Sequence, residues 1–379
     1  MVYALAAVFL VLAWQSLTVH INYGGNWTAL FCSGDRWPPP AELSGTYVFP
    51  NSTGYDGQFY RYVAHDPWIR KGWDGHFDVP AMRRARILLP ATAWLLAFGQ
   101  DRLVDAAYIS AVLLCVFLGT WWLGCWAKLQ HRSEAWGLAF LALPATLISI
   151  DRMTIDVALT ALCAGVLLYS ARDCPGRVAA LLAAAALVRE TGLIFIAACC
   201  SLALFKRQYF RTAAYAAAAL PAFVWWAYVN AQVTVEVPPH AYNWLFRYPF
   251  AGLFLQLFRP EAYTFGPLLT RAVQAADALA LAGAIAAVAA AGWSLRRRPF
   301  TLESWMAVWF LLLVAGVSTP KFWAQAYNYA RPLSPMLLVM ALPAVKRHLF
   351  WALAPVLMID VRIAAQLVPQ AWGVVRGLI

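Results

Sequence analysis

The feature that most constrains this chain is a succession of apolar segments, most of them long enough to cross a lipid bilayer. Hydrophobic residues make up 62% of the sequence and charged residues only 12%, whereas soluble globular proteins carry about 25% charged residues. A membrane-spanning helix needs about 20 apolar residues, and it satisfies all of its backbone hydrogen bonds internally. The sequence therefore predicts an all-α polytopic membrane protein.

The net charge of +11 comes from short basic clusters that lie between the apolar segments. This is the positive-inside pattern of membrane proteins, not a basic face on one helix, so we expect no nucleic-acid partner. The clusters that we place on the cytoplasmic side are Lys128/His131/Arg132, Arg172/Arg177, Lys206/Arg207/Arg211, Arg296/Arg297/Arg298 and Lys346/Arg347/His348.

Counting apolar segments between these clusters predicts one transmembrane domain, residues 1–379, with about eleven helices. An uncleaved first helix is expected from Val2 to about Ile21. A long external loop, residues 22–102, follows it, and a second external loop covers residues 230–271. The sequence thus alternates between membrane segments and two outward-facing polar regions.

Two apolar runs do not fit the length of a single span. Ile87 to Gly99 is too short to cross, and we expect it to form a juxtamembrane helix at the membrane interface. Val178 to Phe205 has basic residues at both flanks and carries Arg189-Glu190-Thr191-Gly192 in its middle. We expect a hairpin of two short helices there, with this tetrad at the outer tip.

The first external loop contains the stretch GYDGQFY, residues 54–60, whose acid Asp56 is out of keeping with the apolar background. Other polar residues fall on the same side, and each ionisable group near membrane depth costs about 2.5–3.5 kcal/mol, so the gathering implies a cavity or mutual pairing. We expect an outward polar cavity. These other residues are His65, Asp66, Asp74, His76, Asp78, Arg83, Arg84, Arg86, Asp151, Arg152, Asp156, Arg189, Glu190, His240, Lys321, Tyr327 and Arg331.

Acids and arginines together at the outer membrane boundary suit a substrate with a phosphate head and a lipid tail. Arginine binds phosphate oxygens bidentately, and a carboxylate can act as general base towards an acceptor hydroxyl. A lipid-phosphate sugar is such a substrate. Transfer with inversion places the carboxylate on the face of the sugar opposite the leaving phosphate, as in inverting glycoside hydrolases.

Four stretches carry a resemblance to a known family: GYDGQFY in the long loop after the first helix, RARILLP at residues 84–90, LVRETG at 187–192 and YNYARP at 327–332. Together they resemble bacterial members of the GT-C superfamily of integral-membrane glycosyltransferases. The resemblance implies a GT-C-like helical bundle in the bacterial inner membrane, a polyprenyl-phosphate sugar as donor and an active site that faces the periplasm. It also implies that Asp56 is the catalytic base.

The expected reaction moves one sugar to a glycolipid, glycan or protein acceptor of the cell envelope. Asp56 lacks the adjacent acid found in some branches of the superfamily, so we expect no metal or other cofactor. The residues that we assign to substrate binding are Tyr55, Gln58, Tyr60, His65, Arg86, Arg189, Glu190, Tyr327 and Arg331.

Other interpretations remain open at this point. Asp56-Gly57 is also a common turn signal, and Arg83 and Arg84 would suit contacts with lipid headgroups. Asp74, His76 and Asp78 alternate as ligands of a divalent cation would on a strand, or they lie in a solvated loop. Asp151, Arg152 and Asp156 would also form a self-compensating turn.

The alternative function is a transporter or flippase of a lipid-linked saccharide, which would use a similar charged cavity without catalysis. A transporter requires a path open to both sides and related helix bundles. A non-enzymatic assembly partner in envelope biogenesis is a third hypothesis, but it leaves the gathering of charge unexplained.

Overall fold

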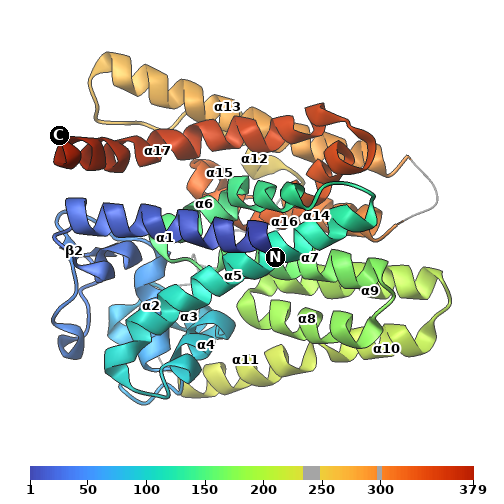
Figure 1. Cartoon of the computed structure of the whole chain (residues 1–379), viewed down its shortest axis with the longest axis horizontal. Coiled ribbons are helices and arrows are strands. Elements are labelled where there is room, and N and C mark those ends of the chain that lie inside the picture. The colour runs from blue at the N-terminus through green and yellow to red at the C-terminus, as the bar shows by residue number, and fades with distance from the viewer. Residues whose placement is uncertain (234–247, 297–300) are drawn as a thin grey trace.

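The computed structural model describes residues 1–233, 248–296 and 301–379 of the chain (Figure 1). Within these ranges, five helical segments are long and apolar enough to cross a membrane. They are α1 (Val2–Asn22), α5 (Asp101–Leu129), α10 with α11 (Tyr209–Gln232), α13 (Pro267–Ser294) and η7 with α17 (Phe350–Leu378). By helix length and hydropathy, the protein is a multi-pass membrane protein, as predicted.

Further helices complete the bundle. The helix pair η4 (Glu134–Ala142) and α6 (Pro144–Arg152) is bent by 60° and is apolar enough to make a sixth span. Four shorter apolar helices are α7 (Asp156–Ala171), α8 (Pro175–Val188), α14 (Leu302–Gly316) and the segment Glu190–Phe205, which comprises η5 (Glu190–Gly192) and α9 (Leu193–Phe205). Helix α16 (Ala326–Arg347) runs through the core and is almost entirely buried.

The predicted hairpin between Val178 and Phe205 is confirmed, because α8 and α9 are separate helices joined at Arg189–Gly192. Gly192 lies so close to the carbonyl oxygen of Ala185 that no larger residue fits there. The short apolar run from Ile87 to Gly99 is also helical, as α4 (Leu88–Leu96).

The predicted first loop, residues 22–102, is folded into helices that pack on the end of the bundle. Its helices are η1 (Trp27–Phe31), η2 (Ala41–Leu43), α2 (Asp56–His65), η3 (Trp73–His76), α3 (Pro80–Ala85) and α4. The strands β1 (Ser33–Gly34) and β2 (Val48–Phe49) form a short parallel ladder in which Ser33 pairs with Val48. The loop is therefore a compact cap, and α2 is buried along nearly its whole length.

Helix α16 begins at Ala326 and contains Pro332, because proline inside a membrane helix is tolerated where neighbouring helices satisfy the freed carbonyls. The predicted second loop, residues 230–271, lies between α11 (Leu220–Gln232) and α13, which begins at Pro267, and it contains the short helix α12 (Ala251–Leu257). Residues 234–247 of this region, including His240, lie outside the described residues.

The basic clusters meet at one end of the bundle. Arg132 donates a hydrogen bond to the carbonyl of Val345, and Lys346 lies over the ring of Trp126. Arg211 forms an ion pair with Asp173 from the neighbouring cluster. Arg297 and Arg298 lie outside the described residues. The opposite end carries α2, α3 and the two strands (Figure 1), as the positive-inside argument requires.

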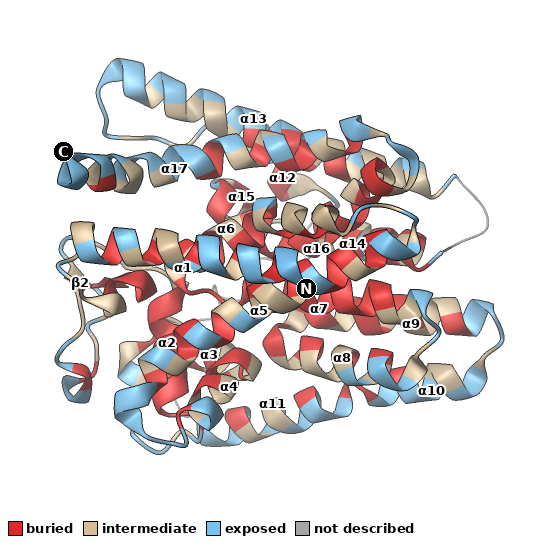
Figure 2. Ribbon diagram, in the orientation of Figure 1, coloured by how far each residue is buried: buried red, intermediate tan, exposed pale blue. Residues whose placement is uncertain are grey.

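Burial separates the core helices from the outer helices of the bundle (Figure 2). Buried residues fill α2, α7 and α16, whereas the outer helices α10, α11, α13 and α17 show many exposed positions. Large apolar side chains occupy these outer positions, such as Phe210 at 87% and Leu268 at 85% exposure. An apolar exposed surface of this kind is stable only in contact with lipid.

Substituting Gly57 by alanine tests the docking of α2. A side-chain carbon at Gly57 would meet the carbonyl oxygens of Arg152 and Phe31, so α2 would have to move, and such overpacking costs about 1–3 kcal/mol. We expect Gly57→Ala to lower the melting temperature of the purified protein in detergent. Gly75→Ala is the matched control, because its added carbon meets nothing within 4 Å. An unchanged melting temperature for Gly57→Ala would contradict this packing.

Candidate functional site

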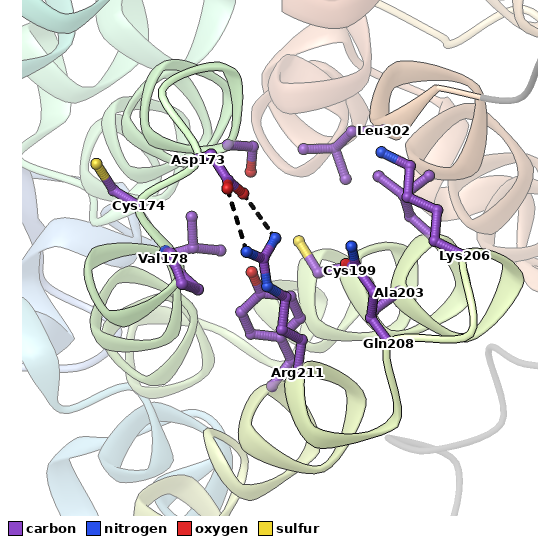
Figure 3. Close-up of a pocket in the computed structure, with 13 residues that line it drawn as sticks. Asp173, Cys174, Val178, Cys199, Ala203, Lys206, Gln208, Arg211 and Leu302 are labelled. Atoms are coloured by element: carbon purple, nitrogen blue, oxygen red, sulfur yellow. Dashed lines mark hydrogen bonds and ion pairs between the residues drawn. The ribbon is translucent and has the colours of Figure 1, made fainter.

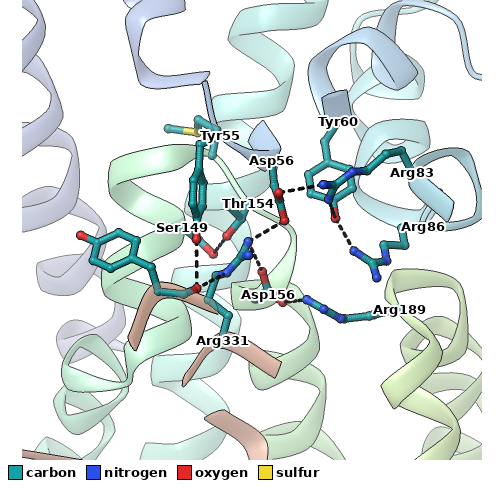
Figure 4. A network of polar contacts seen from close by, with 12 residues as sticks. Tyr55, Asp56, Tyr60, Arg83, Arg86, Ser149, Thr154, Asp156, Arg189 and Arg331 are labelled. Atoms are coloured by element: carbon teal, nitrogen blue, oxygen red, sulfur yellow. Dashed lines mark hydrogen bonds and ion pairs between the residues drawn. The ribbon is translucent and has the colours of Figure 1, made fainter. Parts of the chain in front are cut away.

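Asp56 is the first residue of α2, and two arginines hold its carboxylate. Its Oδ1 lies 2.9 Å from Nη2 of Arg83, and its Oδ2 lies 2.9 Å from Nη1 of Arg331 (Figure 4). Arg83 lies on α3 and Arg331 on α16, so the first loop and the core helix meet at this carboxylate. Arg83 also pairs with Asp78 at 2.7 Å.

A second buried carboxylate continues this arrangement. Asp156, the first residue of α7, lies 2.6 Å from Nη1 of Arg189 and 3.4 Å from Nη1 of Arg331. Arg331 therefore bridges two acids, and its Nε donates to the carbonyl of Tyr327 at 2.7 Å. Figure 4 shows Arg331 between the two carboxylates and Arg189 on the far side of Asp156.

A fourth acid, Glu190, completes the cluster. Glu190 accepts two hydrogen bonds from Arg86, at 2.6 and 3.0 Å, in a bidentate pair. The Nη1 of Arg86 donates to the hydroxyl of Tyr60 at 2.8 Å, and Arg83 lies 3.5 Å from the same hydroxyl. We call this cluster the central network; its charged members are Asp56, Asp78, Arg83, Arg86, Asp156, Arg189, Glu190 and Arg331.

Asp56 and Asp156 are favoured at their positions because each lies at the N-terminus of a helix. Asp56 and Asp156 each occupy the first turn of a helix, where the backbone N–H groups and the helix dipole favour negative charge. Both helices therefore point their positive ends into the central network. The arginines come from loop positions or helix ends of other segments, and Arg331 is 275 residues away from Asp56 in the chain.

Tyr55 supports the network from one side. Its hydroxyl donates to the carbonyl of Tyr327 at 2.9 Å, and the guanidinium of Arg331 lies 4.7 Å from the centre of its ring. Arg152 lies 5.9 Å from the same ring centre. Cation–π contacts of this kind contribute about 0.5–2 kcal/mol, more where solvent is excluded.

The charge state of Asp56 follows from its neighbours. Burial on its own raises the pKa of this carboxyl, but the charges of Arg83 and Arg331 outweigh burial and hold the pKa well below its usual range. Asp56 is therefore a carboxylate at neutral pH in this arrangement. Its basicity is low as long as both arginines remain in contact with it.

Exposure decreases across the central network. The side chains of Glu190, Asp78 and Asp56 are 36%, 30% and 17% exposed, whereas that of Asp156 is fully buried. One edge of the network is therefore accessible from outside, and the opposite edge is sealed inside the bundle. A ligand would reach Asp56 and Glu190 before Asp156.

The structure brings together Tyr55, Tyr60, Arg86, Arg189, Glu190, Tyr327 and Arg331 around Asp56, as the sequence analysis grouped them. It does not bring Gln58 or His65 into this group. Gln58 is fully buried, and its amide bonds the backbone of Gly34 and Thr53 inside the loop. Gln58 thus has a structural position, not one open to a substrate.

His65 occupies the other end of α2, nine residues and about 13 Å along the helix from Asp56. Its ring nitrogens lie 3.2 Å from Asp101 and 3.2 Å from Asp105 of α5. Arg61 forms a bidentate pair with the same Asp105. This group fastens α2 to α5 and is separate from the central network.

Arg83 and Asp156 are not among the predicted site residues, although both pair with residues that are. Arg83 and Arg84 do not face lipid headgroups: both are buried, and Arg84 pairs with Asp66 and Asp74. The signal that would have found Asp156 is an acid at the start of an otherwise apolar helix, because such a charge needs a partner.

Two alternatives from the sequence analysis have different outcomes. Asp74 and Asp78 each bind a separate arginine, and His76 lies 2.8 Å from the carbonyl of Pro38, so these three side chains are used individually. Asp151 and Arg152 do compensate each other, at 2.8 Å, but Asp156 pairs elsewhere. The gathering of external charge is thus satisfied largely by mutual pairing.

Two cavities lie at the opposite end of the bundle, among the basic clusters. One, of about 70 Å³, lies beside the Asp173–Arg211 ion pair and is lined by Lys206, Gln208 and Leu302 (Figure 3). It has room for only a few water molecules. The other, of about 780 Å³, lies between α13, α14 and α16.

Comparison of the chain with protein-family models, with curated proteins and with solved structures finds no match. The interpretation of the central network therefore depends on its own geometry and charge.

Substitution of the two aspartates tests the central network. Asp156→Asn leaves Arg189 and Arg331 short of a negative charge at a fully buried position, and breaking a buried ion pair costs about 3–5 kcal/mol. We expect Asp56→Asn to cost less, because Asp56 is partly exposed and its arginines keep Asp78 and Asp156.

The measurement is the free energy of unfolding of each variant, from denaturant titration in detergent micelles. A larger loss for Asp56→Asn than for Asp156→Asn would contradict the assignment of Asp156 as the sealed edge.

Proposed function

We propose that the protein is a glycosyltransferase of the GT-C type that moves one sugar from a polyprenyl-phosphate-linked donor to a lipid, glycan or protein acceptor. Asp56 acts as the general base. The observation that carries this proposal is a partly exposed carboxylate held between Arg83 and Arg331, at the end of the bundle opposite the basic clusters.

In this proposal the acceptor hydroxyl approaches Asp56 from the accessible edge. The carboxylate accepts the hydroxyl proton as the acceptor oxygen bonds to the first carbon of the sugar, and the prenyl phosphate leaves from the opposite face. The leaving phosphate gains negative charge, so positively charged donors must lie where it departs.

The central network offers such donors. Arg189 makes one hydrogen bond, from Nη1 to Asp156, and its Nε lies 3.4 Å from Oε1 of Glu190 as an ion pair without a hydrogen bond. Its neighbour Arg86 presents a bidentate fork that now binds Glu190. The positive ends of α2 and α7 add to the attraction for an anion.

Donor binding would also change the pKa of Asp56. A donor phosphate brings negative charge into the network that shares Arg83 and Arg331 with Asp56, and this charge raises the pKa of Asp56. The base would become effective only when the donor is present.

The membrane arrangement is consistent with this reaction. If η4 with α6, the four shorter apolar segments and α16 also cross, the described helices supply the eleven spans of the expected GT-C-like bundle. We place the protein in the bacterial inner membrane with the central network on the periplasmic side, where a polyprenyl-phosphate sugar would present its head.

A transporter or flippase of a lipid-linked saccharide is the second candidate. It would need polar groups along a path between both ends of the bundle. The network instead ends at the fully buried Asp156, and the core helix α16 beyond Arg331 is lined by apolar residues such as Leu337 and Met340. This distribution favours an enzyme.

Removal of the proposed base tests the reaction directly. We expect Asp56→Asn to reduce sugar transfer from a radiolabelled polyprenyl-phosphate sugar by at least about 100-fold, the usual contribution of a general base. Purified wild type and variant would be incubated with a lipid extract and with donors that carry mannose, glucose, galactose or arabinose. Transfer at the wild-type rate would exclude Asp56 as the base.

Asp101→Asn is the matched control, because Asp101 lies at the same end of the bundle but binds Lys71 and His65 instead of the central network. Asp101→Asn should retain transferase activity.

A chelator in the same assay tests whether the reaction needs a metal. Movement of labelled lipid across vesicles without any transfer would instead support the transporter.

The pH dependence of the reaction tests the coupling between donor and base. The acid limb of kcat/KM reports the free enzyme and that of kcat reports the enzyme with bound substrate. Because the arginines hold the pKa of Asp56 down only before the phosphate arrives, we expect the acid limb of kcat at higher pH than that of kcat/KM. Initial rates across the pH range in which the protein stays folded locate the acid limb of kcat and show whether kcat/KM falls at the same pH. Coincident limbs would show that the phosphate leaves these arginines in place.

A further inference from the structure

The cavity of about 780 Å³ at the basic-cluster end is independent of the central network. Its walls are formed by α13, α14, α16, η7 (Phe350–Leu353) and the adjoining residues Thr301 and Leu349, and alanines of α13 create the space. Ala286 and Ala290 of α13 and Val339 and Leu342 of α16 are among the residues that line it. Its volume lies within the range of about 300–1,000 Å³ that is typical of ligand sites.

The cavity has an apolar interior and a charged rim. Lys346 and Arg347 lie at the rim together with Glu303, which pairs with Lys346 at 2.6 Å. Arg347 is exposed and forms no ion pair among the described residues. Trp293 and Trp351 also line the rim and are 57% and 64% exposed.

The depth of the cavity matches one leaflet of a bilayer. From Val339 to Arg347 on α16, and from Ala286 to Ser294 on α13, each wall covers nine residues, whose Cα atoms span about 12 Å along the helix. Half of the hydrocarbon core is about 15 Å thick. Tryptophan and basic residues at one end of such a groove are the usual composition at the level of the headgroups.

We propose that this cavity binds one acyl chain of an anionic phospholipid, whose phosphate lies against Lys346 and Arg347. The apolar walls fit the chain, and the cations at the rim select a negatively charged headgroup over a neutral one. Glu303 keeps Lys346 in place at the mouth of the cavity. The bound lipid would fill the space between α13, α14 and α16 and so hold these helices together.

Native mass spectrometry of the delipidated protein tests this site. The protein would be mixed with equal amounts of phosphatidylglycerol and phosphatidylcholine of identical acyl chains. We expect the first lipid adduct to be phosphatidylglycerol. Arg347→Gln should reduce this preference about fivefold, the effect of one basic residue near a headgroup. Arg207→Gln, an exposed arginine at the same end that does not line the cavity, should leave it unchanged.

A second experiment fills the cavity with a larger side chain and measures whether the lipid adduct is lost. Ala286→Phe should remove the first adduct, whereas Ala282→Phe, one turn away at an exposed position outside the cavity, should not. Equal binding of the two lipids, binding of detergent or free fatty acid in preference to phospholipid, or retention of the adduct by folded Ala286→Phe would each overturn the proposal. Arg347 is exposed, so its variant remains informative even if Ala286→Phe fails to fold.

Discussion

The buried carboxylate of Asp156 is the interaction on which the arrangement of this end of the molecule depends. Its side chain is inaccessible to solvent and binds Arg189 and Arg331, which come from two other segments. An unpaired charge at this depth would be very costly, so the start of α7, the α8–α9 connection and α16 have to meet. Arg331 then offers the same guanidinium to Asp56, and the first loop docks on the bundle through that second contact.

The two ends of the bundle consequently have different chemistry. One end holds carboxylates and arginines whose exposure rises from Asp156 to Glu190, which suits a polar substrate that arrives from outside. The other end holds the basic clusters and an apolar cavity with a cationic rim. A lipid-linked donor at the first end and a bilayer phospholipid at the second would use the same physical rule, in which arginine or lysine meets phosphate beside an apolar chain.

Several features were predictable because they depend on local sequence. The break at Arg189–Gly192 and the helix at Leu88–Leu96 follow from the lengths of apolar runs. Residues separated by several helices were harder to assign. Gln58 belongs to the GYDGQFY stretch but turns into the loop, because successive residues of a helix face different directions. Arg83 looked like a headgroup contact, yet the fold of the first loop buries it beside Asp56.

By itself the sequence determined the membrane class, the helical segments and the common end of the basic clusters, because a backbone in lipid must satisfy its own hydrogen bonds and positive charge stays on one side. It also singled out Asp56. Only the tertiary structure decided which arginine binds which acid, and that Asp156 shares Arg331 with Asp56. Ion pairing acts through space over a few ångströms, and these partners are up to 275 residues apart in the chain.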